Sequence, residues 1–239
     1  MRRVIWVAAI STSVASILGG TWLALYLRQP MLGFEDTDDP AVGVRFVREH
    51  PEVFAQTGVV LILMAMVLVV AVASVAELHD QIRPRWPIHA ASAVGMFAAL
   101  CFLVFGAMRI GASEPLLHIA GLRQEWGEAA YLVVQMAGVQ GALPAGMLAL
   151  AAWAVGLSAI GLREGTIPRA VCLLGIVPAI HVLGRILGEA GGLPNGVWIV
   201  VVLSIPGTLA WCLALGIGLM TRLRPGSQKL AEPTSEVQP

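Results

Sequence analysis

Long apolar segments with very few charged residues limit what this chain can fold into. A helix of about 20 apolar residues crosses the roughly 30 Å hydrocarbon core of a bilayer. Six segments meet this length, at residues 4–27, 57–78, 88–111, 139–162, 170–188 and 197–221. Apolar residues make up 57% and charged residues 13% of the 239 positions, whereas soluble domains are about 25% charged. The sequence therefore predicts an all-α, polytopic transmembrane bundle of six spans rather than a soluble domain.

The distribution of basic residues predicts how this bundle is oriented. Six spans place both termini on one side, and nine of the 15 Lys and Arg residues lie on that side. Basic residues in short loops stay in the cytoplasm, so we expect both termini to be cytoplasmic, in a bacterial-type cytoplasmic membrane. The first apolar segment is much longer than the 7–15 residues of a signal-peptide centre, which favours a retained first helix.

Two domains of different character follow from this layout. Residues 1–223 form the predicted transmembrane domain, and residues 224–239 are rich in Pro, Ser, Glu and Gln, which predicts a disordered cytoplasmic tail. A short surface helix is predicted at residues 41–49 on the outer side. Asp39 can cap this helix and Pro40 can open its first turn, because a missing N–H costs nothing there.

Prolines and small residues predict how the spans pack. Pro144, Pro178 and Pro206 lie inside apolar segments, where each frees a backbone carbonyl and can kink its helix. Small residues at four-residue intervals allow helices to approach closely, either within one bundle or in a homo-oligomer. They form two stripes, one of Thr12, Ser16 and Gly20 and one of Gly184, Gly188 and Gly192.

Ionisable residues at membrane depth are the first candidates for a functional site. His181 lies twelve residues after Arg169, which is about 18 Å into the hydrocarbon core. His181, Arg185 and Glu189 are four residues apart and share one helix face. Arg109 and Arg185 lie near the outer boundary, where an arginine can also simply extend to water.

A second polar stripe precedes the fourth span. Its members are spaced by three and four residues and share one side if the region is helical. A straight helix leaves the hydrocarbon core near Gln140, so a solvated surface is the alternative to a membrane site. The stripe consists of Gln124, Glu128, Tyr131, Gln135 and Gly138.

These positions lead to the hypothesis of an outward-opening polar cleft between the third, fourth and fifth spans. A set of unrelated interfacial charges is the alternative. The expected ligand-binding residues are His181, Arg185, Glu189, Glu128, Gln135 and Arg109.

Several kinds of chemistry lack support in the sequence. Cys101, Cys172 and Cys212 stand apart in apolar runs and form neither a disulfide framework nor a zinc motif. The five histidines include no pair at matching depth on facing spans, as a haem would need. Protease, hydrolase and nucleotide-binding motifs do not occur, and 15 basic residues balance 15 acidic ones. We therefore expect no metal, no cofactor and no nucleic-acid partner.

The function favoured by these observations is non-enzymatic. We expect a membrane protein that binds, senses or helps to move a small or lipidic ligand through the polar cleft. The alternative is an intramembrane enzyme that uses His181 with Glu128 or Glu189 as acid–base groups. A structural partner subunit is a third interpretation.

Two short motifs carry a resemblance to known sequences. One is the turn at residues 162–169, Leu-Arg-Glu-Gly-Thr-Ile-Pro-Arg, and the other is Pro206-Gly207 followed by Trp211 and the run Ala214-Leu215-Gly216. In these motifs the chain resembles an uncharacterised family of bacterial six-helix integral membrane proteins, known as a domain of unknown function. The resemblance implies a six-helix layout. It implies no established activity, substrate or cofactor, so it transfers no functional residue.

Overall fold

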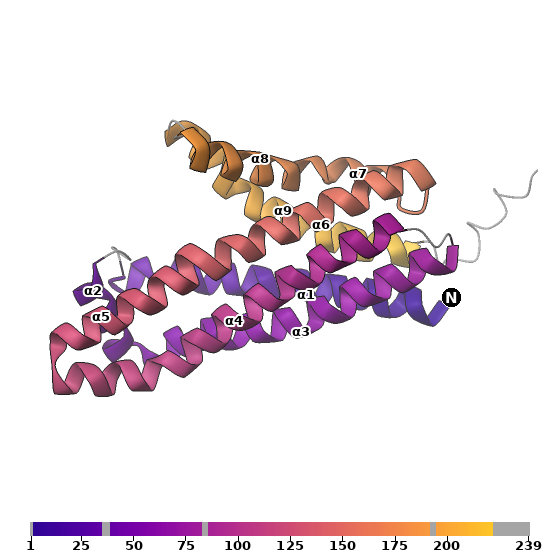
Figure 1. The fold of residues 1–239 in the computed structure, drawn as a ribbon. Helices are drawn as coiled ribbons and strands as arrows, with labels where there is room; N and C mark the ends of the chain where they lie inside the picture. The colour runs from indigo at the N-terminus through magenta and orange to yellow at the C-terminus, as the bar shows by residue number, and fades with distance from the viewer. Residues whose placement is uncertain (1, 35–38, 83–85, 192–194, 222–239) are drawn as a thin grey trace, which may run out of the picture.

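The computed structural model describes residues 2–34, 39–82, 86–191 and 195–221 (Figure 1). Every regular element in these ranges is a helix. The predicted tail at residues 224–239 lies outside the described residues. The elements in chain order are α1 (Arg2–Arg28), η1 (Pro30–Leu32), α2 (Pro40–Glu49), α3 (Pro51–Ile82), α4 (Trp86–Leu122), α5 (Gln124–Gln135), the π-helical segment η2 (Met136–Ala142), α6 (Leu143–Glu164), α7 (Arg169–Leu174), α8 (Ile176–Gly191) and α9 (Asn195–Thr221).

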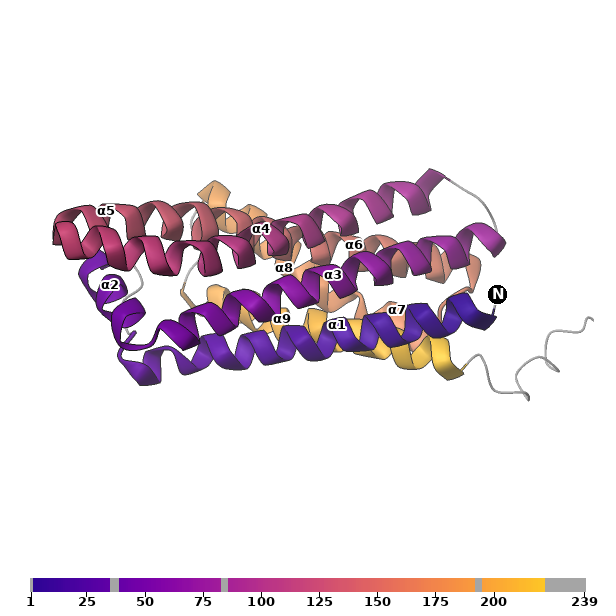
Figure 2. The same cartoon turned by 90° about the horizontal axis from the view of Figure 1, so that it is seen from below.

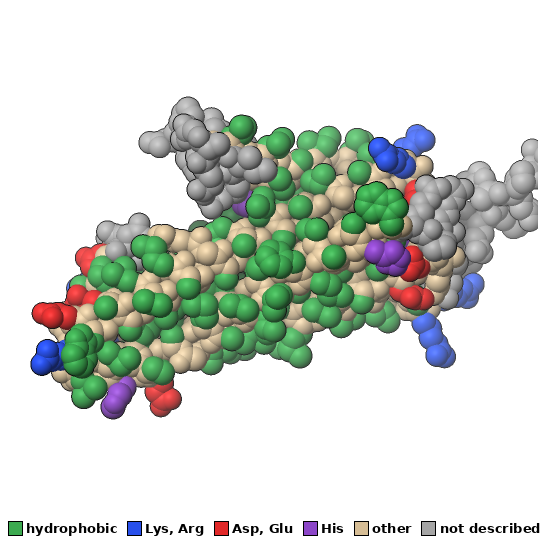
Figure 3. Space-filling view, in the orientation of Figure 1, with side chains coloured by type: hydrophobic (Ala, Val, Ile, Leu, Met, Phe, Trp, Pro, Cys, Tyr) green, Lys and Arg blue, Asp and Glu red, His purple; other side chains and the backbone are tan. Residues whose placement is uncertain are grey.

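The long helices run side by side in an elongated bundle. Helices α1, α3, α4 and α6 follow its long axis, while α2 lies at one end beside α5 (Figures 1 and 2). We call this end the α2 end. On the face drawn in Figure 3, charged side chains gather at the two ends and apolar side chains cover the band between them. An apolar band between charged ends is the surface that a bilayer requires.

Five helical stretches among the described residues are long and apolar enough to cross a membrane, so the chain is a multi-pass membrane protein. They are Arg2–Leu32, Pro51–Gln81, Trp86–Leu122, Gln124–Glu164 and Leu203–Thr221. The predicted span at 170–188 corresponds to two shorter helices, α7 and α8, which meet at Gly175. Pro178 explains this break, because it has no N–H to donate to the carbonyl of Leu174. A sixth crossing and the orientation of the termini remain predictions.

The helices at the α2 end are longer than predicted. Helix α4 continues past position 111 and through Pro115 to Leu122, and α5 then returns and continues through η2 into α6. At 37 residues, α4 is about 55 Å long, well above the 30 Å of a hydrocarbon core. The hairpin of α4 and α5 therefore extends beyond the core at this end.

A second, smaller apolar cluster builds this extension. Helix α2 begins as predicted, since Asp39 Oδ1 accepts hydrogen bonds from the N–H groups of Ala41 (2.8 Å) and Val42 (3.4 Å). The apolar face of α2 then packs on α3, α4 and α5. The cluster consists of Phe34, Val44, Phe46, Val47, Val53, Phe54, Leu116, Ala120 and Tyr131. We call α2, α5 and residues 112–122 of α4 the cap.

Small residues bring the spans into close contact. Ser16 Oγ donates a 2.7 Å hydrogen bond to the carbonyl of Leu209, which joins α1 to α9 within the bundle. Gly20 of the same predicted stripe faces open space. Helices α3 and α4 cross at a pair that the sequence analysis missed, Gly58 and Gly106. A Cβ on either glycine would lie 2.7 Å from the carbonyl oxygen of the other.

Candidate functional site

The most unusual side chain in the described structure is Arg109 of α4, which is only 3% exposed. It lies 23 residues after Trp86, which is about 35 Å along a straight helix. This position is near the boundary of the hydrocarbon core at the α2 end. An arginine there was expected either to bind a ligand or to extend to water. The observed side chain does not reach water and is enclosed by the protein.

Aromatic rings form most of the surroundings of Arg109. Its guanidinium carbon lies 4.1 Å from the ring centroid of Phe54 and 5.7 Å from that of Phe105. Both distances are within the range of cation–π attraction. Arg109 Nε also donates a long hydrogen bond, 3.4 Å, to the carbonyl of Phe54. Rings and a carbonyl therefore partly replace the water that the cation has lost.

No carboxylate of the described residues pairs with the Arg109 guanidinium. Among the described residues, no acidic side chain lies within 4.0 Å of Arg109, and its Nη2 atom has no hydrogen-bond partner. A buried arginine normally has such partners, because an unpaired buried charge is costly. Nη2 can therefore donate to an acceptor from outside the described residues.

Two further residues of the predicted stripe are buried at the same end, and Tyr131 belongs to the apolar cluster that contains Phe54. Tyr131 of α5 is 1% exposed, and its hydroxyl donates a 3.4 Å hydrogen bond to Oε1 of Gln135, which is itself buried. Tyr131 lies within electrostatic range of the Arg109 guanidinium, as does Tyr26 of α1. The later members of the predicted stripe, Tyr131, Gln135 and Gly138, are therefore buried in the bundle. Tyr131 contributes to the electrostatic surroundings of Arg109.

Local features of the chain explain how these groups come together. The crossing of Gly58 and Gly106 brings α3 close to α4, one turn before Arg109. Gly138 in η2 packs on Phe105, where a Cβ would lie 2.7 Å from the ring. The π-helical geometry of η2 ends just before Pro144, which cannot donate the usual backbone hydrogen bond. Such π segments often occur beside functional sites.

Sequence analysis missed two polar side chains at the same end, Trp22 of α1 and Gln29 just after α1. Gln29 is 1% exposed, and neither atom of its amide has a partner among the described residues. Trp22 is also buried, and its Nε1 has no partner there. With Tyr26, these residues are spaced by four and three positions and share one helix face. That spacing at the end of an apolar segment was the signal that could have identified them.

The other predicted site residues lie elsewhere or outside the description. His181 is 5% exposed, and its Nδ1 is hydrogen-bonded to Ser204 Oγ of α9 at 3.1 Å. Helix α8 packs against α6, α7 and α9, away from the cap. Glu128 is half-buried on α5 and accepts a 2.9 Å hydrogen bond from Gln124. The side chains of Arg185 and Glu189 lie outside the described residues.

The structure therefore places Tyr131, which is hydrogen-bonded to Gln135, within electrostatic range of Arg109, and it leaves Glu128 and His181 in separate contacts. Within the part of the chain that is described, no group of three or more His, Cys, Asp and Glu side chains could hold a metal ion. At the other end of the bundle the described polar groups include some that bond to the protein itself. For example, His79 is hydrogen-bonded to the carbonyl of Val75 and to Thr166 Oγ1.

Comparison with known proteins found no matching protein family, no matching curated protein and no matching solved structure. The assignment of the site therefore depends on the residues and geometry described above. These identify the chain as a helical, multi-pass integral membrane protein with a cation buried at the α2 end.

Proposed function

We propose that this membrane protein binds a small or lipidic ligand through an oxygen-bearing group of that ligand, held by Arg109. The observation that carries the proposal is the buried guanidinium whose Nη2 has no partner among the described residues. A carboxylate, phosphate or carbonyl oxygen is the natural partner for such a donor.

The aromatic rings around Arg109 offset only part of the free-energy cost of burying its charge. A desolvated cation–π contact contributes about 2 kcal/mol, whereas burial of an unpaired charge costs several kcal/mol. An acceptor from a ligand would supply the missing hydrogen bond where water is excluded. Gln135 and Tyr131 would also face this ligand. The rings of Phe54 and Phe105 would contact its apolar parts. Mostly apolar surroundings with a few polar groups are typical of ligand sites.

Binding explains this arrangement better than catalysis. An arginine stays protonated and is a poor general acid or base. The alternative of an intramembrane enzyme requires His181 close to Glu128 or Glu189, and the described contacts of His181 and Glu128 involve different partners. We therefore propose that His181, together with Arg185 and Glu189 on its helix face, contributes to ligand binding separately from Arg109.

The proposal includes a membrane topology. We propose six crossings with both termini in the cytoplasm of a bacterial-type cell, so that the α2 end faces outward. The excess of basic residues on the side of the termini supports this orientation. A ligand would then reach Arg109 from the outer side or from the outer leaflet. A homo-oligomer that uses a small-residue helix face is compatible with this arrangement.

The test is to compare what co-purifies with three proteins. The wild type, Arg109→Gln and Arg123→Gln are purified in a maltoside detergent, and bound small molecules and lipids are identified by mass spectrometry. Arg123 is the matched control, because it is an exposed arginine at the same end of the molecule. We expect a species with a carboxylate, phosphate or carbonyl group that is retained by the wild type and by Arg123→Gln and is lost from Arg109→Gln. Equal retention by all three proteins would refute the proposal.

A further inference from the structure

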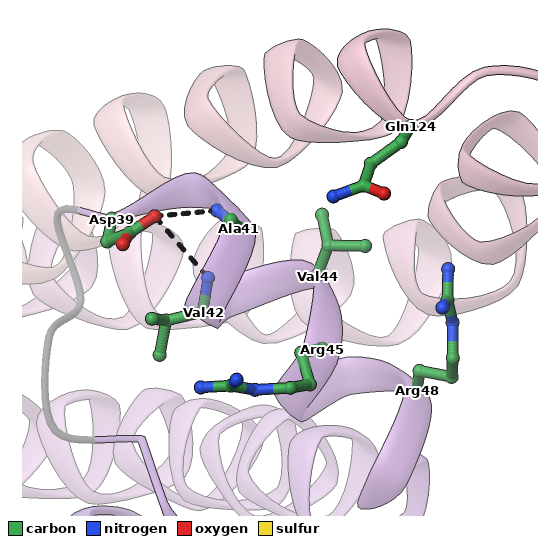
Figure 4. Close-up of a pocket in the computed structure, with 7 residues that line it drawn as sticks. All are labelled: Asp39, Ala41, Val42, Val44, Arg45, Arg48 and Gln124. Carbon is green, nitrogen blue, oxygen red and sulfur yellow. Dashed lines mark hydrogen bonds between the residues drawn. The ribbon is translucent and has the colours of Figure 1, made fainter.

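The cap contains a pocket that is separate from the surroundings of Arg109. Helix α2 and the start of α5 enclose a space of about 320 Å³ (Figure 4). Its polar lining comes from Asp39, Arg45 and Arg48 on the α2 side and from Gln124 on α5. In Figure 4 the Arg45 and Arg48 side chains extend from α2 in different directions, and the Gln124 side chain points from α5 toward α2.

The guanidinium groups of Arg45 and Arg48 give this pocket two positive charges. Arg45 and Arg48 are three residues apart on one helix, so their side chains leave from neighbouring positions on its surface. Both are exposed, and neither forms an ion pair with another residue of the described chain. Each guanidinium carries five N–H donors, so two cations without an ion pair in the described chain border this pocket.

The helix that carries these arginines is held firmly. Its buried face includes Phe46 and Val47, at 2% and 1% exposure. Gly43 lies directly against the ring of Tyr131, in a space that a Cβ would fill. The carboxylate of Asp39 adds a negative charge to the pocket, but one of its oxygens is already engaged by two N–H groups at the start of α2.

We infer that this pocket binds a phosphate group. A carboxylate has two oxygens and usually occupies one guanidinium, whereas a phosphate has more acceptor oxygens and can bind two guanidinium groups together. The amide nitrogen of Gln124 donates one hydrogen bond to Glu128, and its second N–H offers a further donor from the opposite helix. This inference is independent of the ligand proposed for Arg109.

The phosphate could belong to a lipid headgroup or to a water-soluble compound. Helix α2 ends at Glu49, just before α3 begins at Pro51. It therefore lies beyond the apolar part of α3, at about the depth of the headgroup layer, which extends roughly 5–7 Å from the hydrocarbon core. Both sources can reach a pocket at this level.

The experiment has one arm for each source. Protein in a phosphate-free maltoside detergent at low ionic strength is titrated with inorganic phosphate by calorimetry. In the second arm, phosphatidylglycerol is added to the micelles and bound lipid is counted by native mass spectrometry. Low ionic strength matters because salt screens exposed charges. The variants are Arg45→Gln and Arg48→Gln. Arg123→Gln is the control, because Arg123 is an exposed arginine between α4 and α5 that does not line the pocket.

We expect Arg45→Gln and Arg48→Gln each to weaken binding about tenfold, as loss of a charge-assisted hydrogen bond does, while the control keeps the wild-type affinity. Binding of inorganic phosphate with this dependence identifies a soluble phosphate compound, and binding of the lipid alone with the same dependence identifies a headgroup. The inference is overturned if neither probe binds or if Arg123→Gln weakens binding as much as the pocket variants do. Because the substituted residues are exposed, circular dichroism should show unchanged helix content.

Discussion

Replacement of Arg109 by methionine should stabilise the ligand-free protein, although it removes contacts seen in the structure. Methionine is unbranched, apolar and adaptable, and its terminal methyl reaches about as far as arginine Nε, so it can pack against Phe54 and Phe105. The guanidinium is 3% exposed, lacks an ion-pair partner among the described residues and has one nitrogen without a hydrogen bond there. Its presence is therefore costly unless a ligand is bound.

The size of the effect follows from the contacts that are lost and the cost that is removed. The substitution removes the cation–π contacts with Phe54 and Phe105, together worth about 2 kcal/mol, and the 3.4 Å hydrogen bond to the Phe54 carbonyl, worth at most about 1 kcal/mol. It also removes the burial of an unpaired charge, which costs several kcal/mol. We expect a net gain of about 1–2 kcal/mol, at the lower end of the gains measured when buried ion pairs become apolar.

The free energy of unfolding can be measured by titration with SDS in mixed micelles, followed by tryptophan fluorescence. Bound lipid must first be removed by detergent exchange, because a ligand would stabilise the wild type alone. Arg109→Lys is the matched control. Lysine keeps the buried charge but lacks the planar guanidinium that stacks on the aromatic rings. This variant should therefore be less stable than the wild type. If Arg109→Met is destabilised by more than about 1 kcal/mol, the guanidinium is a structural element and the reasoning is wrong.

Three further predictions concern the scaffold of the site and its orientation. Gly106→Ala should lower the free energy of unfolding by about 1–3 kcal/mol, because its Cβ would lie 2.7 Å from the Gly58 carbonyl. Gly20→Ala faces open space and should not destabilise the protein in the same assay. Asp39→Ala should cost about 1 kcal/mol through loss of the α2 cap, detectable as a lower thermal unfolding midpoint; an unchanged midpoint would argue against the capping bonds. Reporter fusions should place both termini in the cytoplasm, and opposite compartments for the two ends would contradict the topology.

The sequence predicted those parts of the fold that depend on local chemistry. Apolar runs located the long helices, and the pair Asp39-Pro40 located the start of α2 because capping involves only neighbouring residues. The break between α7 and α8 also has a local cause in Pro178. Continuation of α4 through Pro115 could not be predicted in this way, because contacts with the rest of the cap stabilise that part of the helix.

The candidate site was predicted only in part. Arg109 and Gln135 were selected because polar residues near a membrane boundary are uncommon, and both proved to be buried close to Tyr131. Their burial results from the return of α5 along α4, which spacing along the chain does not reveal. The buried amide of Gln29 was missed because glutamine just beyond an apolar segment normally faces water.

An experimental density map of the wild-type protein in lipid nanodiscs tests the central claim most directly, at a resolution that separates the guanidinium nitrogens. We predict a non-protein feature within hydrogen-bonding distance of Arg109 Nη2, on the side away from the Phe54 carbonyl. A protein carboxylate or backbone carbonyl bonded to Nη2, with no other density beside it, would contradict the account.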